Sequence, residues 1–226
     1  MRSAVLLLLI LGVALGSASV AAEDAPRVLF LFPSMGAMGS EFFDAYEQFE
    51  ERGVVADVAA GVTGPYTFWE DSAEAQRAVG IVRGYSFEIT LAIADVDAET
   101  YDAILVGPAF AHAFWFEPGN ERGLEIINEA AARGTLIGGI SWGVWVILGQ
   151  GLLDGRMACD WPHPLGVVSP PAHWDGFLSN FDVAGYTEEC LHIDEGRGSE
   201  PTIVTANYRC PAAFADAISD LLLGRD

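Results

Sequence analysis

The feature that most limits how this chain can fold is an apolar run interrupted by a glycine-flanked serine. The segment GTLIGGISWGVWVILGQG, residues 134–151, begins with β-branched and aliphatic residues, breaks at two glycines and resumes as an apolar, helix-like pattern. Residues 139–143 read Gly-Ile-Ser-Trp-Gly and match G-x-S-x-G, the pattern of a nucleophile elbow, in which a sharp strand-to-helix turn exposes the central side chain. We therefore expect Ser141 at a strained turn between a buried strand and a helix.

Strand-like and helix-like segments alternate along much of the chain. Continuous apolar runs predict four strands of one parallel central sheet, at Arg27–Pro33, Val54–Ala59, Ala103–Val106 and Thr135–Ile140. Apolar residues at helical spacing predict helices within residues 39–53, 120–134 and 211–224. This alternation is typical of an α/β fold with helices on both faces of the sheet. Such folds place their sites at the carboxyl ends of the strands, where Ser141 falls.

The N-terminus is typical of a secretory signal peptide. Arg2 is followed by an apolar run to about Leu15 and by small residues at positions 20–22. We expect cleavage after residue 22, a secreted or periplasmic protein, and a single domain over residues 23–226. An uncleaved N-terminal anchor is the alternative. We find no second segment long enough to cross a bilayer, so we expect no stable membrane insertion after cleavage.

The charge of the chain argues against nucleic acid as a partner. The formal net charge is −21, and all eleven basic residues are arginine. A surface this acidic repels phosphate backbones and anionic lipids. Adaptation to high salt explains the acidity, and so does ordinary acidity combined with a genome that favours arginine. We expect the partner to be a small molecule or a peptide.

Three cysteines occur, at positions 159, 190 and 210. Their spacing fits no zinc pattern, and we expect neither a metal nor a cofactor. The segments CLHID and PTIVTAN are separated by the turn-prone EGRGSE and predict a β-hairpin. Export to an oxidising compartment favours one disulfide, and this hairpin would bring Cys190 close to Cys210.

Several blocks of the sequence, in this order, resemble the ThiJ/PfpI family, relatives of the class I glutamine amidotransferase domain. They are RVLFLFP, GSEFFDAYEQFEERGVVADVAA, YDAILVGPA, GTLIGGISWGVWVILGQGLLDGR and IVTANYRCPAAFADAI. The resemblance covers nearly all of the chain after the signal. It implies a flavodoxin-like three-layer α/β sandwich with a mainly parallel central sheet, and a homodimer.

The resemblance also implies a site at the elbow. In the family a cysteine occupies the elbow and a glutamate from the loop after the first strand bonds to it; here Ser141 and Glu41 match those positions. The histidine that commonly follows the nucleophile is replaced by Trp142. The family's strand-end glycine pair is replaced by Pro108 and Ala109, and proline has no N–H to donate. Backbone N–H groups of Ala109 and Trp142 remain the expected oxyanion donors.

A serine nucleophile needs a general base. His112, just beyond a predicted strand end, is the candidate base, and a purely structural loop histidine is the alternative. Phe114 and Trp145 are expected to line the pocket, with a dimer interface or plain core packing as alternatives. Arg209 and Cys210 fall where the family's terminal loop approaches the elbow. Cys210 is therefore either a pocket thiol or one half of the disulfide.

These observations support an exported ThiJ/PfpI-like protein that retains the elbow pocket, with altered or absent catalysis and a stress-related role in small-molecule binding. One alternative is a serine-dependent hydrolase, or an enzyme of glyoxalase or deglycase type, that acts through Ser141. Another is a small, esterase-like α/β-hydrolase, since Asp182 and His192 follow Ser141 in the order acid, then histidine.

Overall fold

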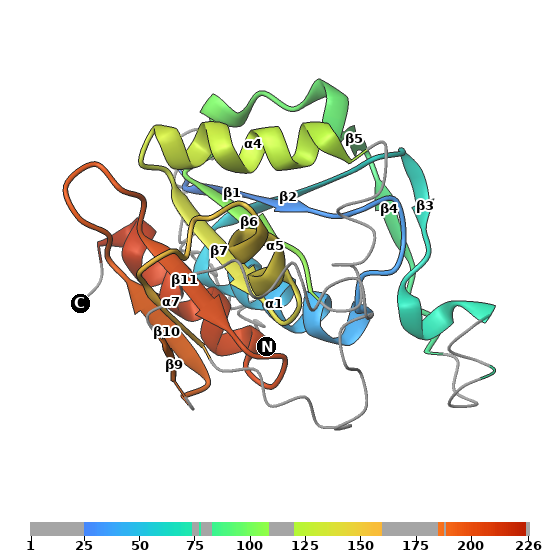
Figure 1. Ribbon diagram of the computed structural model, residues 1–226. Coiled ribbons are helices and arrows are strands. Elements are labelled where there is room, and N and C mark those ends of the chain that lie inside the picture. The colour runs from blue at the N-terminus through green and yellow to red at the C-terminus, as the bar shows by residue number, and fades with distance from the viewer. Residues whose placement is uncertain are drawn as a thin grey trace, which may run out of the picture.

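The buried apolar runs form neighbouring strands of one sheet (Figure 1). The computed structural model describes residues 25–73, 77, 83–108, 120–159, 185–187 and 189–224. The helices and strands are β1 (Arg27–Leu31), α1 (Gly39–Arg52), β2 (Val55–Ala60), β3 (Gly64–Tyr66), β4 (Phe87–Ile89), β5 (Leu91–Ala92), β6 (Ala103–Val106), α4 (Glu121–Ala132), β7 (Leu136–Ile140), α5 (Gly143–Gly149), β8 (Met157–Cys159), β9 (Gly185–Thr187), β10 (Leu191–Asp194), β11 (Ile203–Ala206) and α7 (Pro211–Leu223). Three short 3₁₀ turns are η1 (Trp69–Asp71), η2 (Ile93–Asp95) and η3 (Ala98–Thr100).

Within the described ranges, the central sheet has seven strands in the order β10-β11-β7-β6-β1-β2-β5. Every neighbouring pair is parallel except β10 with β11, which form an antiparallel hairpin. The four predicted parallel strands are confirmed as β1, β2, β6 and β7, and the predicted hairpin is confirmed as β10 and β11. With helices on both faces, the flavodoxin-like α/β prediction is confirmed.

Helices α4 and α5 cover one face of the sheet. Ile126 and Ile127 of α4 and Val146 and Ile147 of α5 are fully buried in one apolar cluster with the side chains that β1, β6 and β7 direct to this face. The apolar positions of α4 recur at helical spacing, so one side of the helix faces the sheet and the other faces solvent. Figure 1 shows α4 lying across this face.

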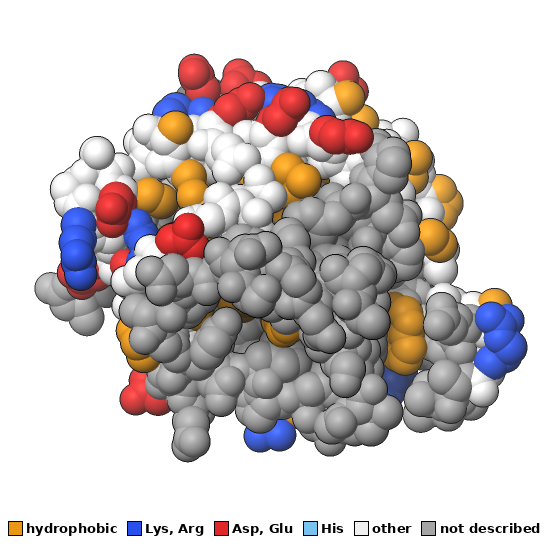
Figure 2. Space-filling model, in the orientation of Figure 1, with side chains coloured by type: hydrophobic (Ala, Val, Ile, Leu, Met, Phe, Trp, Pro, Cys, Tyr) orange, Lys and Arg blue, Asp and Glu red, His pale blue; other side chains and the backbone are white. Residues whose placement is uncertain are grey.

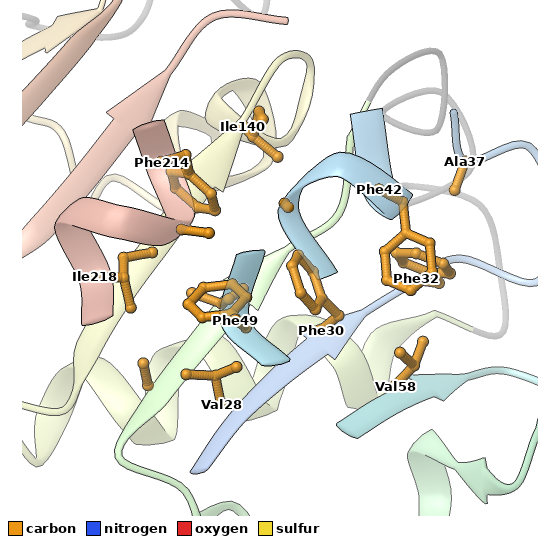
Figure 3. Packing of buried hydrophobic residues seen from close by; sticks show 14 of the residues in the cluster. Val28, Phe30, Phe32, Ala37, Phe42, Phe49, Val58, Ile140, Phe214 and Ile218 are labelled. Atoms are coloured by element: carbon orange, nitrogen blue, oxygen red, sulfur yellow. The ribbon is translucent and has the colours of Figure 1, made fainter. Parts of the chain in front are cut away.

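Helices α1 and α7 cover the opposite face, where the core is aromatic. Figure 3 shows Phe42 and Phe49 of α1 close to Phe30 of β1. The Phe30 ring meets those of Phe42 and Phe49 edge-on, with centroids 5.4 and 5.8 Å apart. Edge-to-face rings at this separation stabilise packing beyond the area they bury. This cluster fixes α1 against the sheet and therefore fixes the start of that helix.

Polar contacts join α1 to α7 at the edge of this layer. The guanidinium of Arg52 forms ion pairs with Asp216 and Asp220, and the Gln48 amide donates to Asp216 at 2.9 Å. Gly53 ends α1 in the left-handed conformation, with φ of 76°, and its N–H donates to helix carbonyls. The last helix of the chain thus holds the far end of α1, while the aromatic cluster holds its middle.

Charged side chains gather over α4. In Figure 2 acidic and basic side chains lie side by side along the upper edge of the molecule, where Figure 1 shows α4 and, above it, the green segment that precedes β6. There Arg122 pairs with Glu129 at 2.6 Å and with Glu125 at 3.4 Å. Within the described part of the chain, no helix has the length and hydropathy needed to cross a membrane.

The Asp71 carboxylate fixes the segment between β3 and β4, which pair in a separate two-stranded sheet. The side chain of Asp71, in η1, accepts backbone N–H bonds from Arg83, Gly84 and Tyr85 at 2.6 to 2.7 Å. The backbone N–H of Trp69 donates to the Ala37 carbonyl at 2.8 Å. Contacts on both sides therefore hold η1 beside the start of α1.

The predicted disulfide between Cys190 and Cys210 is present, and their Cα atoms are 6.0 Å apart. That separation is within the usual range for a disulfide. The bridge joins the residue before β10 to the residue before α7, across the end of β11. Cys159 is the free cysteine; it is buried, and its Sγ lies 3.1 Å from the Glu189 carbonyl oxygen.

We expect the disulfide to stabilise the fold substantially. Closing a loop of this size is worth about 3 kcal/mol, so dithiothreitol should lower the free energy of unfolding measured in urea by about that amount. The same reductant should leave the Cys190→Ser/Cys210→Ser variant unaffected. Three titratable thiols in the denatured, unreduced protein, instead of one, would contradict the pairing.

Candidate functional site

Ser141 lies at the turn from β7 to α5, with its backbone in the left-handed region. Its φ is 58°, the only positive value for a non-glycine residue among the described ranges. The residue is 1% exposed, its N–H donates to the Ala206 carbonyl at 2.8 Å, and its carbonyl accepts from Val144 at 3.2 Å. A serine in this conformation stores on the order of 1–3 kcal/mol of strain, which the surrounding structure must hold. The predicted strained elbow is confirmed.

Two glycines allow this turn because they bring α5 very close to the sheet. A Cβ on Gly143 would lie 2.5 Å from the carbonyl oxygen of Val106, at the end of β6. A Cβ on Gly139 would lie 2.5 Å from Cδ1 of Ile147. No side chain fits at the first position without moving backbone. The spacing of glycines around Ser141 is therefore a packing requirement of the elbow.

Glu41 approaches Ser141 from the first turn of α1. Its side chain is 8% exposed. Burial raises the pKa of Glu41 to about 8; the Ser141 hydroxyl beside it works against this rise, and the negative charge of Glu70 adds to it. At neutral pH the carboxyl is therefore mostly protonated. Protonated, it is a hydrogen-bond donor and no longer a base.

The Ser141 hydroxyl and the Glu41 carboxyl lie beside each other and have no third partner among the described residues. Ser141 Oγ and Glu41 Oε2 are both buried, and neither has a hydrogen-bond partner of full geometry among the described residues. Buried polar atoms are normally paired, and unpaired ones often mark a functional site. Glu41 belongs to α1, on one face of the sheet, and Ser141 to the turn between β7 and α5. The two side chains meet at the carboxyl ends of the strands.

Glu70 is a part of this site that the sequence analysis missed. Its carboxylate accepts the backbone N–H groups of Gly39 and Ser40 at 2.8 and 3.0 Å, and the Ser40 hydroxyl at 2.9 Å. Glu70 is itself 8% exposed. The signal for such a residue was Met38, which occupies the N-cap of α1 and has no side-chain acceptor. The first N–H groups of α1 therefore need an acceptor from another part of the chain.

Four other predicted site residues have described surroundings; the role of the Trp142 backbone N–H as an oxyanion donor stays a prediction. Trp142 is buried, and its ring lies 5.6 Å from that of Trp145, which packs against the core on the α4 side of the sheet. Arg209 is exposed, and its guanidinium lies over the neighbouring Tyr208 ring at 5.3 Å. Cys210 is in the disulfide, so it supplies no free thiol.

The remaining predictions fall on residues that the structure does not describe. Ala109, His112 and Phe114 lie within residues 109–119, outside the described ranges. The histidine that is described, His192, pairs with Thr205 in the β10–β11 hairpin. Among the described residues, no group of three histidine, cysteine or acidic side chains could hold a metal ion.

A parallel sheet with a serine at a strained strand-to-helix turn defines a class of nucleophile-elbow proteins. Residues 26–174 match the sequence profile of the DJ-1/PfpI family, and the chain belongs to that family. The predicted resemblance is thereby confirmed. The α/β-hydrolase alternative is wrong, because the family is different and His192 lies on an antiparallel edge strand; Asp182 is outside the described residues.

Solved structures of this family share the fold. A ThiJ/PfpI domain protein from Brachyspira murdochii superposes with a TM-score of 0.66 at 16% identity, covering 88% of this chain and 98% of that one. Oxidised DJ-1 from Toxoplasma gondii gives a TM-score of 0.64 at 19% identity, covering 89% of this chain and 92% of that one. At these identities the similarity establishes the fold alone.

A characterised relative is similar over part of its length. A γ-glutamyl-L-1-hydroxyisopropylamide hydrolase from a Pseudomonas species is 36% identical over 122 residues, which cover 48% of this chain. The aligned region spans only 39% of the relative. Its activity is therefore a property of that longer protein.

The close approach of α5 to the sheet makes Gly143 sensitive to substitution. Gly143→Ala should lower the free energy of unfolding in urea by about 3 kcal/mol, because its Cβ would overlap a backbone carbonyl. Gly198→Ala is the control: Gly198 has φ of 66° and open space around its Cβ position, so only conformational strain, about 1 kcal/mol, should appear. Equal losses would contradict the packing role.

Glu41 should make stability depend on pH. The pKa of this carboxyl rises from 4.5 in the unfolded chain to about 8 in the folded protein. Between these values the folded state binds the extra proton, so this group's contribution falls as pH rises, by up to about 1.4 kcal/mol per pH unit. Glu41→Gln should therefore gain stability over wild type as pH increases from 5 to 8. The exposed Glu47→Gln should run parallel to wild type, and a parallel Glu41→Gln curve would refute the shifted pKa.

Proposed function

We propose that this DJ-1/PfpI protein uses the Ser141–Glu41 pocket to bind a small molecule and that its catalysis is altered or absent. The observation that carries the proposal is the burial of the Glu41 carboxyl beside the Ser141 hydroxyl, which raises the pKa of that carboxyl to about 8. A serine hydroxyl is hardly ionised near neutral pH and becomes a nucleophile only when a base removes its proton. Protonated Glu41 cannot act as that base.

The same pair is well suited to binding. Ser141 Oγ and Glu41 Oε2 are both without a full hydrogen-bond partner among the described residues. Together they offer hydroxyl and carboxyl groups that can donate and accept in a buried setting, where hydrogen bonds to a ligand are stronger than in water. A small molecule or peptide with carbonyl or amide groups matches this arrangement.

We also propose export and homodimer formation. The disulfide between Cys190 and Cys210 supports export, since disulfides persist in oxidising compartments. Mass spectrometry of the mature protein tests the cleavage after residue 22, and light scattering tests the dimer. A stress-related role belongs to the same proposal and is tested by the phenotype of a deletion strain under oxidative challenge.

The competing function is a hydrolase that acts through Ser141. The Pseudomonas relative is named as a hydrolase, which supports this alternative. A glyoxalase or deglycase activity would use the same side chains. In either case Glu41 must lose its proton before it can serve as a base, so turnover should rise with pH around the Glu41 pKa of about 8.

Replacing Ser141 by cysteine separates the two functions. In Ser141→Cys a hydrogen bond from protonated Glu41 should stabilise a thiolate, so the new thiol should react with iodoacetamide at pH 7 at least about tenfold faster than an unperturbed thiol. Glu41→Ala added to Ser141→Cys should remove that gain. Wild-type protein measures the background from the buried Cys159, which is subtracted.

Wild-type protein should show little esterase or methylglyoxal turnover and little labelling by a fluorophosphonate probe. Turnover that Ser141→Ala abolishes would reject the proposal in favour of the hydrolase. An unreactive thiol in Ser141→Cys would reject a retained elbow pocket.

A further inference from the structure

Glu70 is buried next to the site, yet the proposed function assigns it no role. It lies in η1, about thirty residues after Glu41 in the sequence, and is 8% exposed. Both of its carboxylate oxygens accept hydrogen bonds from the first turn of α1, at 2.8 to 3.0 Å. A carboxylate is expensive to bury unless such bonds compensate it. Its position is therefore closely defined.

The bonds to Glu70 change the electrostatic effect of the α1 N-terminus on the Glu41 carboxyl. The free N–H groups of a helix N-terminus carry partial positive charge and favour a nearby ionised carboxylate. Here Glu70 accepts two of those N–H groups, from Gly39 and Ser40, and brings a full negative charge in their place. Glu41, the next residue of the helix, thus faces a like charge where a helix N-terminus would ordinarily offer a positive one.

Within the described ranges, Glu70 is the residue whose charge raises the pKa of Glu41. From α5 and β7 the group that faces Glu41 is the uncharged Ser141 hydroxyl. On α1 itself, Asp44 is exposed one turn further along. The Tyr85 ring lies against Gly39, where a Cβ would come within 2.4 Å of it.

The backbone around Glu70 is fixed independently of Glu41. The neighbouring Asp71 accepts N–H bonds from residues 83–85, and the Trp69 N–H donates to the Ala37 carbonyl. Glu70 is thus attached to the loop before α1 on one side and to the segment before β4 on the other. These contacts fix the backbone of η1, and the bonds from Gly39 and Ser40 fix the Glu70 carboxylate itself.

We propose that Glu70 is the positioning residue of the elbow site: it holds the first turn of α1 so that the Glu41 carboxyl faces Ser141, and its charge adds to the burial that keeps that carboxyl in the neutral, hydrogen-bond-donating form. This role rests on the proposed function of the Ser141–Glu41 pair. The hydrogen bonds of Glu70 go to Gly39 and Ser40 and not to Ser141, so Glu70 acts through Glu41.

The titration of Glu41 tests the role directly. Protein labelled with ¹³C-glutamate is titrated from pH 5 to 9.5, and the Glu41 carboxyl signal is assigned by its loss in Glu41→Gln. Wild type should titrate with a midpoint near 8. Glu70→Gln removes the charge with little change of shape and should lower the midpoint by about half a pH unit. Glu47→Gln removes an exposed charge from the same helix and should leave the midpoint unchanged.

The outcomes separate this role from the proposed function. A midpoint that stays near 8 in Glu70→Gln overturns the role of Glu70 and leaves the neutral Ser141–Glu41 pair standing. A wild-type Glu41 that is already ionised at pH 6 overturns both. If Glu70→Gln does not fold, Glu70→Ala serves instead, because it also removes the negative charge. The midpoint should then fall as well, and an unchanged value overturns the role.

Discussion

The contact between Gly143 and the carbonyl oxygen of Val106 is the constraint on which the site depends. It lets α5 begin directly against the end of β6, so the chain must reverse within the two residues that follow β7. Ser141 occupies that reversal and takes a backbone conformation that most side chains avoid. The close packing of Gly143 against β6 therefore places the Ser141 hydroxyl at the carboxyl end of β7. This placement does not depend on a hydrogen bond made by the hydroxyl.

Electrostatics give this geometry its chemical character. Two buried carboxyl groups lie near the same helix start, and they differ in what surrounds them. Glu70 has three hydrogen-bond donors, whereas Glu41 has the Ser141 hydroxyl beside it and an oxygen without a partner. Unequal surroundings give the two acids different positions in the site: Glu70 accepts bonds from the first turn of α1, whereas burial raises the pKa of Glu41 to about 8.

The sequence was sufficient for the features that depend on local pattern. Continuous apolar runs predicted β1, β2, β6 and β7, glycine spacing predicted the elbow at Ser141, and the hairpin predicted the disulfide. Glu41 was found only because it matches a family position. Glu70 was not found, because its contact with α1 exists only after the chain has folded back between β3 and β4. Helical periodicity likewise did not reveal that Trp145 would pack on the α4 side of the sheet.

The bridge from Cys190 to Cys210 also encloses the turn between β10 and β11. Residues 195–200 of this turn are mostly exposed and include Arg197, a site at which trypsin-like proteases cleave. A cut there would divide the chain, yet the disulfide would keep the final helix covalently attached to the larger fragment. Helix α7 would stay packed against α1, and α1 carries Glu41. In a protease-rich environment Glu41 and Ser141 would thus keep their positions after the chain is cut.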